Sequence, residues 1–265
     1  MVVETGKLLE SVMRTVPPLV ALTPPPNVLV IAPRTELRVV HSSVMQAMDV
    51  AAQEQLETSA DSTGVSSLVA PIGGIATYPS MVLEDDSAER VLASVAHEWM
   101  HQYLIFYPLG AGYWDSQETR EINETGAEMI GAEVGGQLAR SLGLSANQSG
   151  GTAPTSKEPA FDFRAYMRET RVQVEQLLGS GEVDAAEAYM RQRRDELAAH
   201  GYAVRKLNQA YFALYGSYGE GFAASPGNPI PGLLHRLRDS SPSLGDFVVR
   251  VRGITSVAEL RQAAG

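Results

Sequence analysis

Cysteine is absent from this chain of 265 residues. Disulfide bonds and thiolate metal sites are therefore excluded, so any metal site must use histidine and carboxylate ligands. Positive charge is scarce as well: Lys and Arg number 21 against 31 Asp and Glu, and the formal net charge is −10. A nucleic-acid partner requires a basic surface, so we expect none.

The sequence also lacks a run of residues that would be expected to form a membrane-spanning helix. The uncharged run from Thr15 to Pro33 is rich in proline, which breaks helices, and the run from Ser62 to Leu83 is rich in glycine, serine and threonine. Near the N-terminus, Glu4, Lys7 and Glu10 interrupt any apolar core of a signal peptide. The residues alone leave two possibilities open, a cytoplasmic protein or the soluble part of a longer, anchored one.

Apolar periodicity predicts an α+β fold. We expect strands at Asn27–Ala32, Ser66–Ile72 and Gly74–Leu83, and helices at Thr5–Val16, His41–Leu56, Ser116–Leu142, Phe161–Leu178, Val183–His200, Ala203–Tyr215, Leu233–Arg238, Leu244–Val251 and Ser256–Ala263. A further helix starts near Asp86, where Glu89 completes a capping box, and ends near Phe106, before Pro108.

This order of elements predicts two lobes. Residues 1–143 should form an α/β lobe with a small mixed sheet, and residues 161–265 an all-helical lobe. The segment 144–160, rich in Ser, Gly, Thr and Pro, should link them. We expect the functional cleft between the lobes.

The segment His97-Glu98-Trp99-Met100-His101 carries the strongest functional signal. Histidines four positions apart share one helix face, so His97 and His101 can bind a single metal ion. Glu98 can reach a water molecule bound to that metal, which is the signature of zinc peptidases. A third ligand is available in Glu124, 23 positions after His101, and Glu121 lies at a comparable distance.

His97-Glu98-x-x-His101 followed by Asn123-Glu124-x-x-Ala127 resembles the gluzincins, the thermolysin and zinc-aminopeptidase group. The resemblance implies a zinc ion held by His97, His101 and Glu124. It favours Glu124 over Glu121, which lacks the preceding Asn and the following Ala. It also implies that Glu98 is the general base.

Further roles follow from the same resemblance. Asn123 and Glu128 should support the metal ligands without binding the metal themselves, although Glu128 occupies a position where thermolysin has Asp. An oxyanion donor should come from the helical lobe, with Tyr211 and Tyr218 as the first candidates. The strand Gly74–Met81 should bind extended peptide along a sheet edge, or else be an ordinary strand.

The helix with Glu124 contains glycines, which are costly in a helix interior. We expect Gly126 and Gly131 to permit close approach of the His97–His101 helix.

The wider chain resembles a little-characterised bacterial family with a His-Glu-Trp-x-His-x-Tyr-Leu core and an Asn-Glu-Thr segment, whose members commonly carry an N-terminal membrane anchor. This favours the soluble part of an anchored or exported bacterial protein over a cytoplasmic one. The prediction is a zinc metallopeptidase that hydrolyses a peptide or protein substrate. The alternatives are a zinc hydrolase of a non-peptide amide or ester, a catalytically silent pseudo-peptidase that binds peptides, and a scaffold with a structural zinc ion.

Overall fold

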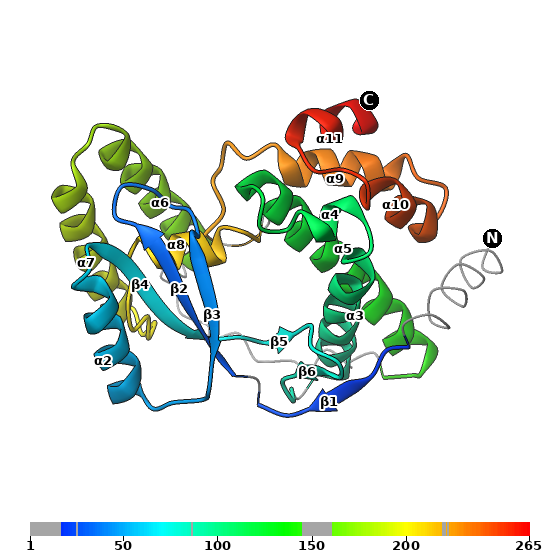
Figure 1. Ribbon diagram of the computed structural model, residues 1–265, viewed down its shortest axis with the longest axis horizontal. Coiled ribbons are helices and arrows are strands. Elements are labelled where there is room, and N and C mark those ends of the chain that lie inside the picture. The colour runs from blue at the N-terminus through cyan, green and yellow to red at the C-terminus, as the bar shows by residue number, and fades with distance from the viewer. Residues whose placement is uncertain (1–16, 25, 86, 145–160, 219–220, 222) are drawn as a thin grey trace. The chain divides into compact units, whose positions relative to one another are not determined.

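The computed structural model describes residues 17–24, 26–85, 87–144, 161–218, 221 and 223–265. Both helices and strands are present, so the predicted α+β class is confirmed at that level. The chain forms two compact units, whose elements are labelled in Figure 1. The first unit draws on the segments Met1–Pro25, Gly73–Gly151 and Pro229–Gly265, and the second on Pro26–Ile72 and Thr152–Asn228.

Two long helices, α3 (Ala88–Leu104) and α5 (Gln117–Ser141), pack against each other in the first unit. Each begins at a serine N-cap: the Ser87 hydroxyl accepts a hydrogen bond from the backbone N–H of Arg90 (3.3 Å), and that of Ser116 from Thr119 (3.0 Å). The other helices of this unit are α4 (Pro108–Ala111), α9 (Ile230–Asp239), α10 (Leu244–Val251) and α11 (Val257–Ala264).

A small sheet adjoins these helices. Strand β6 (Ser80–Val82) lies between β1 (Val20–Leu22), to which it is parallel, and β5 (Gly74–Ile75), to which it is antiparallel. Strand β5 is therefore an edge strand, and both β5 and β6 contact α3.

The apolar core of the first unit joins α3 and α5 to the C-terminal helices. Its fully buried members include Leu104, Leu109, Ile122, Leu234, Leu237 and Phe247. Polar bonds reinforce the contact: the backbone N–H of Leu109 donates to the carbonyl of Arg252 (3.0 Å), and the Thr119 hydroxyl donates to the carbonyl of Thr255 (2.6 Å).

Glycines set the spacing between α3 and α5. A Cβ atom at Gly131 would lie 2.7 Å from the carbonyl oxygen of Ala93, and one at Gly135 would lie 2.6 Å from the nitrogen of Ala93. Both distances are shorter than Cβ contacts in real proteins, so only glycine fits here. The prediction for Gly131 is confirmed, whereas that for Gly126 is wrong, because a Cβ there meets nothing within 4 Å. The close approach at Gly135 was not predicted, because the sequence does not show which glycine of a helix lies against a neighbouring helix.

The second unit is built on a sheet of order β3-β2-β4. Strand β2 (Asn27–Pro33) pairs antiparallel with β3 (His41–Met45) and β4 (Val65–Pro71). Helix α2 (Val50–Asp61) packs on β4, α8 (Gln209–Tyr215) packs on β2 and β4, and α6 (Phe163–Gly179) packs on α7 (Val183–Ala199). The core of this unit includes Val30, Ala32, Leu68, Met167, Met190 and Phe212.

A buried carboxylate ties the polar parts of the second unit together. Glu57 of α2 is 2% exposed, and its side chain accepts hydrogen bonds from both Arg205 terminal nitrogens (2.9 and 2.5 Å) and from the backbone N–H of Val69 (2.6 Å). Burial raises the pKa of Glu57, but the bonds from Arg205 and Val69 outweigh burial and hold this pKa below its ordinary value of 4.5. The carboxylate is therefore more stable in the folded chain than in water.

The two units do not match the expected lobes 1–143 and 161–265. Helices α6, α7 and α8 share a core with β2 and β4, while α9, α10 and α11 share one with α3 and α5. The physical reason is that each sheet or helix face must be covered by apolar surface, and the covering helices come from distant parts of the chain. Sequence order could not show which helix covers which face.

Most predicted elements are confirmed to within a few residues, but three are wrong. His41–Leu56 is not one helix, because His41–Met45 pairs with β2 as a strand and Asp49 then caps α2 by accepting a hydrogen bond from Ala52 N (2.8 Å). Gly74–Leu83 is interrupted by a turn that contains Pro79, which has no N–H to donate to a sheet.

The third error is the start of α8, predicted at Ala203. Arg205 bonds to Glu57, Lys206 bonds to Asp61, and Asn208 caps the helix by accepting from Tyr211 N (2.9 Å). These tertiary bonds use the residues that would otherwise form the first turns. The predicted helix Thr5–Val16, the cap Asp86 and most of the linker 144–160 lie outside the described residues.

Replacing Gly131 or Gly135 by Ala should destabilise the protein by about 1–3 kcal/mol, because the added methyl forces α3 and α5 apart. Gly126→Ala is the matched control, since its methyl meets open space, and it should leave stability unchanged or raise it by up to about 1 kcal/mol. Denaturant unfolding measures both effects. Equal destabilisation by all three substitutions would contradict the close-packing argument.

Glu57→Gln should destabilise the protein by about 2–3 kcal/mol at neutral pH, because it leaves Arg205 partly buried without its charged partner. The exposed pair Glu36–Arg38, with side chains 52% and 46% exposed, provides the control. Glu36→Gln should cost less than about 0.5 kcal/mol.

The effect of Glu57 should also depend on pH. Because its pKa is lowered on folding, its stabilising contribution is complete above pH 4.5 and is lost as the pH falls through the lower folded pKa. The stability difference between wild type and Glu57→Gln should therefore shrink with acidification, as measured by urea unfolding at a series of pH values. A difference that stays constant down to low pH would argue against the ion pair.

Candidate metal centre

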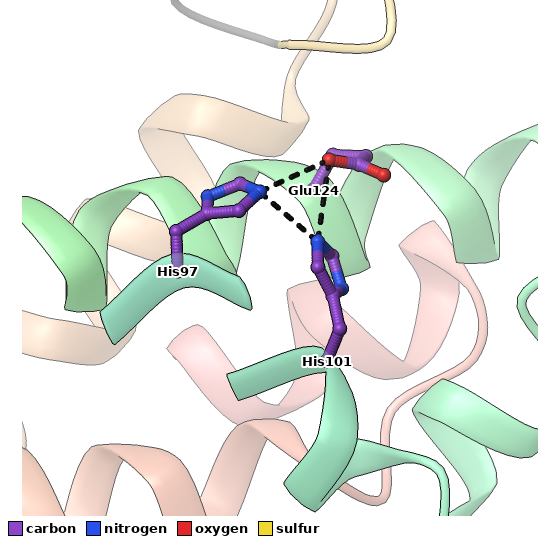
Figure 2. A group of neighbouring side chains, drawn as sticks. All are labelled: His97, His101 and Glu124. Atoms are coloured by element: carbon purple, nitrogen blue, oxygen red, sulfur yellow. Dashed lines mark hydrogen bonds and ion pairs between the residues drawn. The ribbon is translucent and has the colours of Figure 1, made fainter. Parts of the chain in front are cut away.

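Three side chains of the first unit converge on one point (Figure 2). His97 and His101 extend from successive turns of α3, and Glu124 extends from α5. The two histidine Nε2 atoms are 3.0 Å apart, and the Oε2 atom of Glu124 lies 3.6 Å from each of them. This group could hold a metal ion. It includes Glu124 and not Glu121, as the sequence predicts.

The spacing of the three atoms suits a small tetrahedral cation. Ligands at the usual zinc distance of about 2.0–2.1 Å lie roughly 3.3–3.5 Å from one another. The observed separations of 3.0, 3.6 and 3.6 Å bracket that value. Glu124 Oε2 is also buried without a hydrogen-bond partner among the described residues, as expected for an atom whose natural partner is a metal. The donor set therefore fits a zinc ion.

Asn123 positions His101. Its Oδ1 atom lies 2.8 Å from His101 Nδ1, and its own Nδ2 donates to the carbonyl of Leu109 (3.1 Å). The second bond orients the amide so that its oxygen faces the imidazole, which then carries its proton on Nδ1. The lone pair on Nε2 is thereby directed to the metal position.

Tyr113, which lies between α3 and α5 in the sequence, positions Glu124. Its hydroxyl donates to Glu124 Oε1, which leaves Oε2 as the atom that faces the histidines. The guanidinium of Arg120 lies over the Tyr113 ring at 5.2 Å. The signal that could have identified Tyr113 is its place between the two ligand helices, but a tyrosine there is equally compatible with a core or surface role.

The three groups attract positive charge strongly. Burial lowers the pKa of His101, but the adjacent Glu124 carboxylate outweighs burial and raises it to about 9. Burial raises the pKa of Glu124, and the two imidazoles outweigh burial and hold it well below its usual range. The Glu124 carboxylate therefore favours a positive charge beside it, as expected of a group that could hold a metal ion.

Glu98 lies beside the three ligands in a dry environment. It is 8% exposed, and a Cβ atom at Gly74 would lie 2.8 Å from its Cδ and Cγ atoms. The absence of a side chain at Gly74 thus allows the Glu98 carboxyl to lie against edge strand β5. Burial raises the pKa of Glu98, and the negative charge of Glu124 raises it further, while the positive charge on the imidazoles opposes both. Burial thus disfavours the ionised form of Glu98 relative to an exposed carboxyl.

Gln102 fastens the β5–β6 turn to α3, one helical turn after Glu98. Its Nε2 donates to the Ser80 hydroxyl (2.8 Å) and to the carbonyl of Thr77. The helix that carries the metal ligands and edge strand β5 are therefore held together at two points, Glu98 with Gly74 and Gln102 with the turn.

The remaining predicted site residues are not members of the three-residue group. Glu128 is exposed on α5, one turn beyond Glu124, and its support of His97 stays a prediction. Tyr211 and Tyr218 belong to the second unit, where Tyr211 is buried in the core and packs on Phe212 and Tyr215. Their catalytic role also stays a prediction.

Comparison of the chain with protein-family models, curated proteins and solved structures finds no match. The site must therefore be interpreted from its own geometry. Among the helices of the described residues, none combines the length and the apolar character needed to cross a membrane.

Substitution of any of the three converging residues, for example His101→Ala or Glu124→Gln, should abolish stoichiometric metal binding. Asn123→Ala and Tyr113→Phe should weaken it about 10- to 100-fold, because the ligands lose their orientation. Glu121→Gln, one helical turn before Glu124, should bind as the wild type does. Elemental analysis and competition with a chromophoric chelator measure both effects, and an unchanged affinity in Glu124→Gln would eliminate this metal centre.

Proposed function

We propose that the protein is a zinc-dependent hydrolase of the metallopeptidase type, with His97, His101 and Glu124 as zinc ligands and Glu98 as general base. The observation that carries the proposal is the combination of a three-ligand group with a separate, buried carboxyl beside it. A structural zinc site would instead use four protein ligands, and the cluster of described residues supplies three.

Glu98 also favours hydrolysis over other metal chemistry. Two histidines and one carboxylate can equally bind iron in oxygenases. A hydrolase needs an additional base beside the ligands, and Glu98 fills that requirement because its pKa is raised by burial.

In the proposed reaction, the metal ion and the side chains of the protein have separate roles. A bound zinc ion would lower the pKa of a coordinated water to about 7 and polarise the substrate carbonyl. Glu98 would accept a proton on its carboxylate and return it to the leaving amine. Asn123 and Tyr113 keep the ligand atoms oriented through their bonds to His101 and Glu124. Tyr211 and Tyr218 are the proposed donors to the developing oxyanion.

A peptide is the proposed substrate because an open strand lies next to Glu98. Within the part of the chain that the structure describes, β5 pairs with β6 alone, and it contacts Glu98 through Gly74. An extended peptide that adds to this edge would pass its carbonyl groups alongside the general base. The proposed setting is the soluble part of an anchored or exported protein.

The decisive experiment compares wild type, Glu98→Gln and Glu89→Gln, all loaded with zinc, on a mixed peptide library read by mass spectrometry. Glu89 is an exposed carboxylate in the first turn of the same helix and serves as the matched control. Glu98→Gln should retain one zinc ion and lose activity by a factor of about 10²–10⁴, because only the proton transfer is removed. Glu89→Gln should cleave as the wild type does.

The other outcomes separate the rival functions. If zinc-loaded wild type leaves every peptide intact, the same three proteins are assayed on a panel of non-peptide amides and esters. Turnover there that depends on Glu98 would replace the peptidase by a different zinc hydrolase. Zinc binding without turnover of either class would instead support a silent peptide-binding protein. Cleavage that is equal in Glu98→Gln and wild type would eliminate Glu98 as the base.

A further inference from the structure

The second unit contains a cavity of about 330 Å³ whose lining is mainly basic among its charged residues. This volume lies within the range of small-ligand sites, roughly 300–1,000 Å³. Four cations line it, Arg34, Arg191, Arg194 and Lys206, against two carboxylates, Asp61 and Glu187. We call it the α7 cavity, because one wall is helix α7. Such a lining is unexpected in a chain with a net charge of −10.

One face of α7 forms that wall. Glu187, Met190, Arg191 and Arg194 are spaced by three, four and seven positions, which places them on one side of a helix. Met190 is fully buried and belongs to the apolar core, so this face is held firmly. The two arginines stand one helical turn apart and both border the same space.

Other lining residues are bonded to α7 or to one another. Arg34 donates to both carboxylate oxygens of Glu187 on α7 (2.7 and 2.9 Å), and Lys206 pairs with Asp61 at the end of α2 (2.8 Å). Gln209, which is 1% exposed, donates to the carbonyl of Arg34 (2.8 Å). These bonds neutralise Arg34 and Lys206 and keep the walls in place before any ligand arrives.

Arg191, Arg194 and Ser66 supply further hydrogen-bond donors to the cavity. Arg191 is exposed and its side chain makes no hydrogen bond with the rest of the described chain, although its positive charge helps to lower the pKa of Glu187. Arg194 donates through Nε (3.0 Å) and Nη2 (2.6 Å) to Oδ1 of Asp195, whose side chain is 67% exposed, and its Nη1 has no partner among the described residues. Ser66 is 4% exposed, and its hydroxyl accepts from Ala210 N (3.3 Å) while its own proton has no acceptor among the described residues.

We propose that the α7 cavity binds a small molecule through a phosphate or carboxylate group, held by Arg191 and Arg194 with the Ser66 hydroxyl as a third donor. Guanidinium groups match the planar or tetrahedral arrangement of such oxygens with paired N–H donors, which a single exposed lysine cannot do. Arg34 and Lys206, which are already paired with Glu187 and Asp61, stabilise the walls of the cavity. Arg191 and Arg194 would contact the ligand. This site is independent of the metal centre and of its proposed chemistry.

The test titrates the full-length protein with inorganic phosphate and, separately, with succinate, at constant ionic strength, by isothermal calorimetry. At least one anion should bind, and Arg191→Gln and Arg194→Gln should each weaken binding about tenfold or more. Arg168→Gln is the matched control, because Arg168 is an exposed arginine on α6 that does not line the cavity. It should change the affinity less than twofold. The affinity of Arg191→Lys should lie between those of the wild type and Arg191→Gln, since lysine keeps the charge but loses the paired N–H donors.

Selective binding of phosphate or of succinate identifies the ligand's acidic group, and either supports the proposal. Circular dichroism and the thermal midpoint of each variant without ligand separate lost binding from lost structure, and Arg191→Lys serves where a glutamine variant is unfolded. The proposal is overturned if neither anion binds, or if Arg168→Gln weakens binding as much as the cavity variants do. Chelation of metal should leave the affinity unchanged, so failure of this site and failure of the hydrolase are distinguishable.

Discussion

The close packing of α3 on α5 is the constraint on which the metal centre depends. His97 and His101 share one helix, so their convergence follows from helical geometry alone. Glu124 belongs to another helix, and it reaches them only because Gly131 and Gly135 let the two backbones approach at Ala93. The contact at Gly131 also involves His97, since a Cβ there would lie 3.1 Å from His97 Cβ. The contact between α3 and α5 at Gly131 thus determines both the helix packing and the position of His97 relative to Glu124.

Burial at the α3–α5 contact determines how the polar side chains there are oriented and how their pKa values are shifted. Asn123 contacts His101 and Leu109, and Tyr113 contacts Glu124 and Arg120, so the protein itself orients the imidazole and the carboxylate of the group that could hold a metal ion. Glu98, by contrast, lies against the backbone of Gly74, and burial raises its pKa. The same helix therefore carries the two histidines and a carboxyl whose ionised form is disfavoured by burial.

The second unit uses buried charge for a different purpose. Glu57 with Arg205 and Glu187 with Arg34 join segments more than a hundred residues apart. Paired in this way, they fix how the strands and α7 meet, while Arg191 and Arg194 line the same cavity without a bond to Glu57 or Glu187. The sequence does not reveal these pairs, since nothing local distinguishes an arginine with a distant partner, such as Arg205, from a solvated one.

The sequence by itself determined the α+β class and most helices, and it placed His97 and His101 on one helix face, because these features depend on short-range periodicity. The resemblance to the gluzincins pointed to Glu124, but only the packing of α5 on α3 brings that carboxylate to the two histidines. Only the tertiary structure decided that His41–Met45 is a strand, that α8 begins at Gln209, and that the C-terminal helices are divided between two cores. It also decided that Gly135, rather than Gly126, meets α3, and that Tyr113 holds Glu124. These features depend on which distant surface a residue faces, and that is set by the packing of the whole unit rather than by neighbours along the chain.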